Sequence, residues 1–443
     1  GIGLFYQRDN TWFKESKAFV DYITRCQRLL QQGVPVADIA VFTGEEVPAR
    51  ALLPERLVPM LPGIFGQERV NSEATRLANV GQPLEESPVN VMHSAGIIDT
   101  KDWVNALRGY QYDSMNKDVL LNGSEISDGR LTMPLGNSYK ILVLPGKTAM
   151  DPSFKGYSEV IRKRIDELRK QGVIIIDEPY QDDTFDRFGI QRDAILPPNM
   201  AYTHRQTATR DIYFIANQEN KKRDIEVGFR ATGNISLYNP VTDATTTIGH
   251  AGQEGQMFKL TLDAYESAFV LFDRHGDKTE PTPPYTETSL NHRLSTWNVD
   301  FPHIDEPIQS ATLFDWSKSD NDKIKYFSGT ATYRTTLKVK PSRGAKVILK
   351  LGTIHDIAHV YVNGIDCGTA WTAPYEVDIS KAVKRGKNQL RIEVVNTWAN
   401  ALRGSDLGKA PFEGIWTNAR FRMKGDGVIP AGLMGPIEVI ERK

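Results

Sequence analysis

A run of short strands between Tyr333 and Val395 constrains the fold more than any other stretch of this 443-residue chain. Within Leu390–Val394, apolar residues alternate with Arg391 and Glu393, the period-two pattern of a strand with one buried face. Asn363-Gly364 predicts a two-residue hairpin, because both positions need a positive φ, which Asn and Gly tolerate best. Several closely spaced strands with turn signals between them predict a β-sandwich here.

This stretch resembles the sugar-binding jelly-roll domain of the family 2 glycoside hydrolases. The resemblance rests on an aromatic residue at a strand (Tyr333), a strand end at Leu351-Gly352, the Val-x-Val-Asn-Gly sequence of Val360–Gly364, and the Gly-x-Asn-x-Leu sequence of Gly386–Leu390. It implies that residues 288–443 form a jelly roll. A fold alone does not assign an activity, because function resides in sites.

The first segment, residues 1–46, reads as one unit of an α/β fold. Gly3–Tyr6 predicts a short strand, and a polar loop follows it. The apolar stripe and the stop at Gly33 predict a helix over residues 14–32. Val36–Phe42 predicts a buried strand. In a (β/α)8 barrel, the loops after the strands build the active-site face.

This segment and several later motifs resemble glycoside hydrolase family 106, whose known activity is α-L-rhamnosidase. The resemblance implies that residues 1–46 are the last strand and helix of a catalytic barrel. The family's acid and base carboxylates lie upstream of these motifs, and no position of this chain matches them. The matching residues are Arg8, Asn10, Thr11, Trp12, Tyr22, Arg25–Gln27, Leu30–Gly33, Ala37-Asp38, Gly44-Glu45, Tyr112, Asp113, Asn116, Asp118, Gly129–Pro145, Asn396–Asn400 and Gly432–Pro436.

Residues 47–200 predict an α/β domain. Tyr139–Pro145 and Val173–Asp177 read as strands, and a helix between them is expected to begin at Asp151-Pro152 and to place Phe154, Tyr157, Ile161, Ile165 and Leu168 in the core. The turn after the first strand lacks the glycine pattern of a dinucleotide site. No cysteine lies between Cys26 and Cys367, which excludes an amidotransferase nucleophile. The domain resembles the amidotransferase-like accessory domains of glycosidases, which implies a structural role.

Residues 201–276 alternate short apolar strands with polar turns and predict a small antiparallel β-sandwich. Residues 277–287, with three prolines, predict a linker. The overall fold class is therefore multidomain α/β plus all-β: the end of a barrel, an α/β domain, a small sandwich and a C-terminal jelly roll.

Charge and composition exclude several classes of partner. The net charge of −1 gives no electrostatic basis for binding nucleic acid or a membrane surface. No apolar run approaches the ~20 residues of a membrane span. Two cysteines, expected to be unpaired, form no disulfide framework. We expect no cofactor and assign no metal site. The jelly-roll resemblance leaves room for a structural calcium ion, and the family resemblance implies a periplasmic or secreted protein.

Sugar recognition requires aromatic faces and planar hydrogen-bonding groups. The resemblance implies that Arg8, Asn10 and Trp12 belong to the rim of the active site, with a second set at Tyr112, Asp113 and Asn116. The alternative for the jelly-roll candidates is that Trp398 plugs the sandwich while Asn396 and Asn400 hold a bend. The candidates in the jelly roll are Trp371, Tyr375, Asn396, Trp398, Asn400 and Arg403. No catalytic residue is assigned.

Three hypotheses follow for the function. The first is the C-terminal accessory portion of a glycoside hydrolase that acts on terminal α-L-rhamnosides of plant or bacterial polysaccharide. The chain begins without Met or a signal-peptide pattern, so we expect it to start inside a longer protein whose barrel it would contact, and to be inactive alone. The second is a non-catalytic carbohydrate-binding module. The third is a β-galactosidase-like glycosidase fragment with a structural role.

Overall fold

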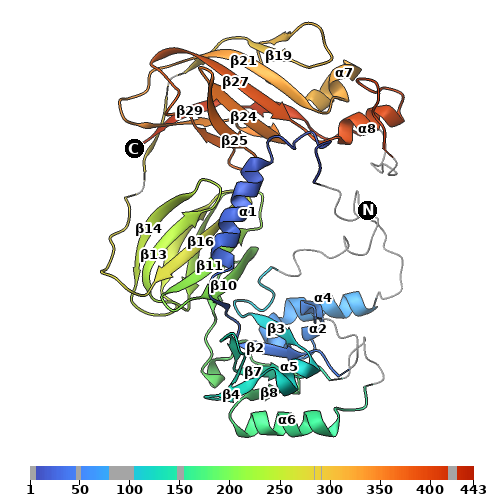
Figure 1. Ribbon diagram of the computed structural model, residues 1–443, viewed down its shortest axis with the longest axis vertical. Helices are drawn as coiled ribbons and strands as arrows, with labels where there is room; N and C mark the ends of the chain where they lie inside the picture. Colours follow the sequence, from blue (N-terminus) through green and yellow to red (C-terminus); the bar gives the residue numbers. More distant parts are fainter. Residues whose placement is uncertain are drawn as a thin grey trace. The chain divides into compact units, whose positions relative to one another are not determined.

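The computed structural model describes residues 6–45, 51–78, 104–146, 154–283, 285–290, 292–417 and 427–443. The chain forms two compact units (Figure 1). Unit 1 contains residues 6–24 and the described residues from 283 onward; unit 2 contains the described residues between 25 and 282. The boundary between residues 24 and 25 falls inside helix α1 (Lys17–Leu30). No helix in the described ranges is long and apolar enough to cross a membrane.

Unit 2 contains a parallel four-stranded sheet. Its strands, in order, are β3 (Tyr112–Met115), β2 (Ile39–Phe42), β7 (Ile141–Val143) and β8 (Ile174–Ile176). Alternate residues of each strand enter different cores, as the period of two requires: Ile39 and Val41 pack in one, and Ala40 and Phe42 in the other. Because both faces of β2 are covered, the strand is buried at every position, and its sequence is therefore apolar throughout.

The expected strand–helix–strand unit is present, but its helix is shorter than predicted. Helix α6 runs over Glu159–Lys170 between the parallel strands β7 and β8. Ile161, Ile165 and Leu168 are buried as expected, whereas Phe154 and Tyr157 precede the helix. The expected start at Asp151-Pro152 lies outside the described residues.

The first segment also differs from expectation. The helix is confined to Lys17–Leu30 instead of residues 14–32, and most of the expected strand Gly3–Tyr6 lies outside the described residues. The strand expected over 36–42 is β2, and its hydrogen-bonded partners are β3 and β7 of the α/β sheet. Parallel partners lie far away in the sequence, so a local pattern does not reveal them.

Smaller elements complete this part of unit 2. They are α2 (Pro54–Leu57), α3 (Pro62–Phe65), α4 (Gln67–Ala78), α5 (Lys117–Asn122) and the antiparallel strands β4 (Glu125–Ser127), β5 (Arg130–Thr132) and β6 (Ser138–Tyr139).

Unit 2 also contains the expected antiparallel strands, which form two sheets around a shared core. The larger sheet has the order β1 (Val34–Pro35), β10 (Met200–Gln206), β11 (Arg210–Asn217), β16 (Ser267–Asp273), β13 (Gly233–Asn239), β14 (Ala244–Ala251). The smaller has β15 (Met257–Leu262), β12 (Arg223–Phe229) and β9 (Ala194–Ile195).

Much of the predicted linker, residues 277–287, is hydrogen-bonded to its neighbours. The Asn234 side chain donates to the carbonyl of Asp277, and the Thr282 amide donates to the carbonyl of Thr247 in β14. On the unit 1 side of the division between residues 282 and 283, the backbones of Thr286 and Lys443 exchange two hydrogen bonds. The described part of the linker is therefore hydrogen-bonded to unit 2 before residue 283 and to unit 1 after it.

Unit 1 contains the predicted β-sandwich. One sheet has the order β17-β29-β22-β26, a second follows β20-β19-β21-β27-β24-β25 with β18 also paired to β21, and β23 pairs with β28. The strands are β17 (Glu287–Ser289), β18 (Arg293–Leu294), β19 (Trp297–Asp300), β20 (Ile308–Ser310), β21 (Thr330–Val339), β22 (Lys346–Lys350), β23 (Thr353–His355), β24 (Ile357–Val362), β25 (Ile365–Ala370), β26 (Glu376–Asp378), β27 (Gly386–Val395), β28 (Gly432–Gly435) and β29 (Glu438–Arg442). Its helices are α7 (Asp322–Lys325) and α8 (Ala399–Asp406).

Two sequence signals account for much of this sandwich. Asn363 and Gly364 adopt φ values of 53° and 80° and join β24 to β25, which confirms the predicted hairpin. Leu390, Ile392 and Val394 of β27 enter the core. Tyr333 is also fully buried, and its hydroxyl accepts a hydrogen bond of 2.6 Å from the Trp316 indole.

Candidate carbohydrate-contacting site

Residues 6–16 form a compact loop, called here the rim loop, which belongs to unit 1 and leads into α1. The Asn10 amide donates to the Gln7 carbonyl, and the Phe13 amide donates to the Asn10 carbonyl, both at 3.1 Å. The Tyr6 ring meets the edge of the Trp12 ring with 5.5 Å between centroids. The Arg8 side chain is exposed, and Asn10 and Trp12 are half-buried. The three candidates of the first set therefore share one turn-rich loop.

The rim loop is attached to the end of strand β27. The Trp398 indole N–H donates to the Asp9 carbonyl at 2.6 Å. The Thr11 hydroxyl donates to the carbonyl of Asn396. In Figure 1 this dark-blue segment lies along the jelly roll near α8. Trp398 therefore contacts the chain's own backbone.

The Asn396 and Asn400 side chains are hydrogen-bonded to backbone groups of the protein, whereas Trp398 is half-buried and is not part of the sandwich core. The Asn396 side chain, 2% exposed, accepts from the Gly329 amide at 3.0 Å and donates to the Phe327 carbonyl at 2.8 Å. Asn400, 0% exposed, exchanges two 2.9 Å hydrogen bonds with the backbone of Ile429. These amides are engaged inside the protein, so neither reaches a surface ligand in this structure.

Trp371 packs against the start of helix α1. Its ring meets the edges of Phe19 at 5.5 Å and Tyr22 at 5.3 Å between centroids. Tyr375 packs against the sandwich core, and burial raises the pKa of its hydroxyl. Arg403 is half-buried in α8, and its Nε atom is buried without a hydrogen-bond partner among the described residues.

The second candidate set lies in unit 2, in and after strand β3. The Tyr112 hydroxyl donates to the Leu52 carbonyl at 2.7 Å, and burial raises its pKa. Asp113 accepts a 2.9 Å hydrogen bond from the Tyr139 hydroxyl. The Asn116 side chain caps helix α5 by accepting from the Val119 amide. All three side chains thus have local partners, and the two candidate sets belong to different units.

Two carboxylates at the ends of the parallel strands also have structural partners. Glu45 accepts hydrogen bonds from the amide and hydroxyl of Ser158 at 2.7 and 2.6 Å and pairs with Lys117. Burial opposes ionisation, but these contacts outweigh it and lower the pKa of Glu45. Asp177 pairs with Arg169 at 2.9 Å. Neither arrangement shows the facing carboxylates of a glycosidase.

One carboxylate in the rim loop was not predicted from the sequence. Glu15 is 7% exposed, and its Oε2 atom has no hydrogen-bond partner among the described residues. Burial raises its pKa, His359 opposes that rise and Glu393 adds to it. A buried carboxyl with these neighbours takes up a proton more readily than an exposed one. Its position directly before an amphipathic helix gave no sign of this burial.

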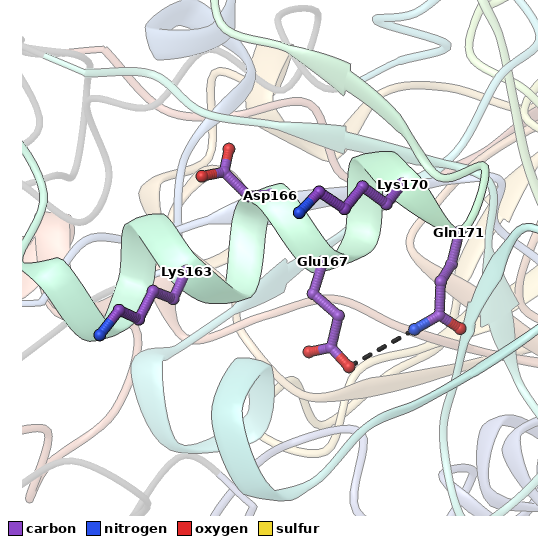
Figure 2. Close-up of a pocket in the computed structure, with 5 residues that line it drawn as sticks. All are labelled: Lys163, Asp166, Glu167, Lys170 and Gln171. Atoms are coloured by element: carbon purple, nitrogen blue, oxygen red, sulfur yellow. Dashed lines mark hydrogen bonds between the residues drawn. The ribbon is translucent and has the colours of Figure 1, made fainter.

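A surface depression on helix α6 does not fit a sugar. Figure 2 shows Glu167 and Gln171 joined by a hydrogen bond and the other charged side chains spread along the helix. Sugar sites need an aromatic or apolar wall, and this lining has none. Within the described ranges, no group of three metal-ligating side chains is suited to hold an ion. The residues that line the depression are Lys163, Asp166, Glu167, Lys170 and Gln171.

Two family models match parts of the chain. The model described as alpha-L-rhamnosidase matches residues 1–82, and the model described as a glycosyl hydrolase 2 galactose-binding domain-like module matches residues 314–421. Both resemblances expected from the sequence motifs are confirmed.

Three individual proteins are similar to this chain, one rhamnosidase and two proteins named as beta-glucuronidases. A rhamnosidase from Novosphingobium sp. PP1Y, of known structure, is 26% identical with a TM-score of 0.72, over 99% of this chain and 42% of that one. A putative beta-glucuronidase from Formosa agariphila is 21% identical over 93% of this chain and 54% of its own length. A beta-glucuronidase from the same organism is 28% identical over 26% of this chain and 12% of its own. The chain thus spans about half the length of the first two.

Proposed function

We propose that this chain is the accessory portion of a glycoside hydrolase that acts on terminal α-L-rhamnosides. The observation that carries the proposal is the likeness to a rhamnosidase over nearly the whole chain, in both sequence and structure. The rhamnosidase family match covers the rim loop, where Arg8, Asn10 and Trp12 combine a guanidinium, an amide and an aromatic ring. Such groups bind sugar hydroxyls and the apolar face of a sugar ring.

In this proposal the chain supplies ligand contacts and support instead of the catalytic pair. Hydrolysis of the glycosidic bond needs two carboxyl groups that face each other across the sugar. Glu15 is buried and Glu45 is engaged at the start of α6. We therefore expect the acid and the base to come from a barrel outside this chain, and a carbohydrate to be the ligand.

The proposal is tested by measuring sugar binding to this chain by saturation-transfer NMR and calorimetry. Methyl α-L-rhamnoside should bind, methyl β-D-glucuronide and methyl β-D-galactoside should not, and p-nitrophenyl α-L-rhamnoside should not be hydrolysed. Arg8→Ala should weaken binding at least tenfold, since charge-assisted hydrogen bonds are the strong ones. Arg162→Ala, at an exposed arginine of helix α6 in the other unit, serves as the matched control. Selective binding of the glucuronide would overturn the rhamnoside assignment.

A second candidate function has an observation of its own. The relative named a putative beta-glucuronidase aligns with 93% of this chain. A β-glucuronide-hydrolysing parent would require a cationic group for the sugar carboxylate, and Arg8 is an exposed guanidinium in the rim loop. The same binding series separates the two candidates.

A further inference from the structure

We propose that the jelly roll acts as a holder for the rim loop, with Trp398 and Asn396 as positioning residues. The proposal deepens the proposed function and rests on it for the identity of the ligand. It concerns contacts within unit 1 alone. In it, the two residues act on the ligand through Asp9 and Thr11, which flank Asn10.

The first argument is that both attachment bonds end on backbone carbonyls. The Trp398 indole reaches the Asp9 carbonyl, and the Thr11 hydroxyl reaches the Asn396 carbonyl. Two hydrogen bonds on either side of one residue fix the position and the orientation of that turn. Neither bond uses the exposed side chain of Arg8.

The second argument is that the holder is itself rigid. Asn396 directly follows the ten-residue strand β27, and its side chain is hydrogen-bonded to the backbone of Gly329 and Phe327. Trp398 occupies the N-cap position of helix α8, whose Asn400 is bonded to Ile429. A binding group is held most accurately when the residues behind it are locked by packing and hydrogen bonds.

The third argument is that a second contact lies farther along the segment. Trp371 packs against Phe19 and Tyr22 in the first turns of α1. The aromatic residues predicted to read sugar thus grip the chain's own segment at two places.

The test uses Trp398→Phe and Thr11→Val, with Trp416→Phe as the matched control because Trp416 is 79% exposed. Thr11→Val keeps the side-chain shape and leaves the jelly roll untouched, so it separates docking from folding. Loss of one hydrogen bond should raise the open population of the loop about fivefold. Tryptic cleavage after Arg8 and Lys14 should accelerate by that factor in both variants and remain unchanged in the control.

In the same two variants the closed loop keeps only one of the two bonds beside Asn10, so its binding groups are held less accurately, and the affinity for methyl α-L-rhamnoside should fall at least about twofold. Unchanged cleavage in both variants overturns the holder, and so does faster cleavage with unchanged affinity, whatever the sugar. Faster cleavage in a protein whose wild type binds no rhamnoside supports the holder and overturns the proposed substrate. The two proposals can therefore fail separately.

Discussion

His204 lies between two carboxylates inside the β-sandwich of unit 2. Its Nδ1 is 2.9 Å from Asp193 and its Nε2 is 3.2 Å from Asp211, and the ring is 2% exposed. Arg230 and Arg274 pair with the same two carboxylates. Because both ring nitrogens face acceptors, the imidazolium form fits this site best.

This arrangement predicts a pH-dependent stability. Burial alone would lower the pKa of His204, but the two aspartates outweigh it and raise the pKa above 6.5. The folded state then holds the proton more tightly than the unfolded state. Its stabilisation is complete below the unfolded pKa and is lost as pH rises through the folded pKa. The melting temperature should therefore fall as the pH rises above about 6.5, as calorimetry can measure.

The variant His204→Gln should be less stable than the wild type at pH 6, and its melting temperature should not show the fall with rising pH. His250→Gln is the matched control, because the His250 ring contacts the Asn234 amide instead of a carboxylate. Parallel pH profiles for wild type and His204→Gln would show that the proton on His204 does not contribute.

At the scale of elements, helix α6 begins without a cap from its own sequence. Ser158 occupies the N-cap position, but its side chain makes no cap bond; Glu45, from the end of β2, accepts its amide and hydroxyl. A carboxylate at this position interacts favourably with the helix dipole. Strand β2 and helix α6 are therefore joined by a residue that is distant in sequence.

Replacing Glu45 tests this link. Glu45→Ala should destabilise unit 2 by about 1 kcal/mol, the usual cost of losing an N-cap, measured by urea denaturation. Amide exchange should accelerate in the first turn of α6. Glu167→Ala, near the other end of the helix, removes an i,i+3 pair with Arg164 and a long hydrogen bond from Gln171, and should cost about 0.3 kcal/mol. Equal losses in the two variants would refute the capping role.

Local patterns predicted the elements whose information is local. The alternation in β27 and the Asn363-Gly364 turn were sufficient for the strand and the hairpin. The sheet to which β2 belongs was not predictable, because the strands that pair with β2 are distant in sequence. Polar residue types also do not reveal their partners: Asn400 suggests a sugar contact, yet it bonds to Ile429. His204 did leave a signal, since it shares the buried face of β10 with Met200 and Tyr202.

At the scale of the whole molecule, the two units have separate cores. Leu349, in β22, lies in the jelly-roll core, and Leu142, in β7, lies in the core beneath α6; both are 0% exposed. Leu349→Ala and Leu142→Ala should each cost 2 to 5 kcal/mol, by an order-of-magnitude rule for buried leucines. Scanning calorimetry should show two transitions, each shifted by one variant. A single transition lowered equally by both would contradict separate cores.

Unit 1 is built from two segments that are far apart in the sequence, and this has a consequence for biosynthesis. The rim loop leaves the ribosome before the jelly roll does, and Trp398 and Asn396, which hold it, follow almost four hundred residues later. At about 5 to 20 residues per second, the loop waits roughly 20 to 80 seconds for its partner. Unit 2, continuous in the described sequence from 25 to 282, can fold during that interval. A ribosome that stalls before β27 would therefore leave Asp9 and Thr11 without the partners that hold them, and the exposed loop would be a nascent-chain substrate for chaperones.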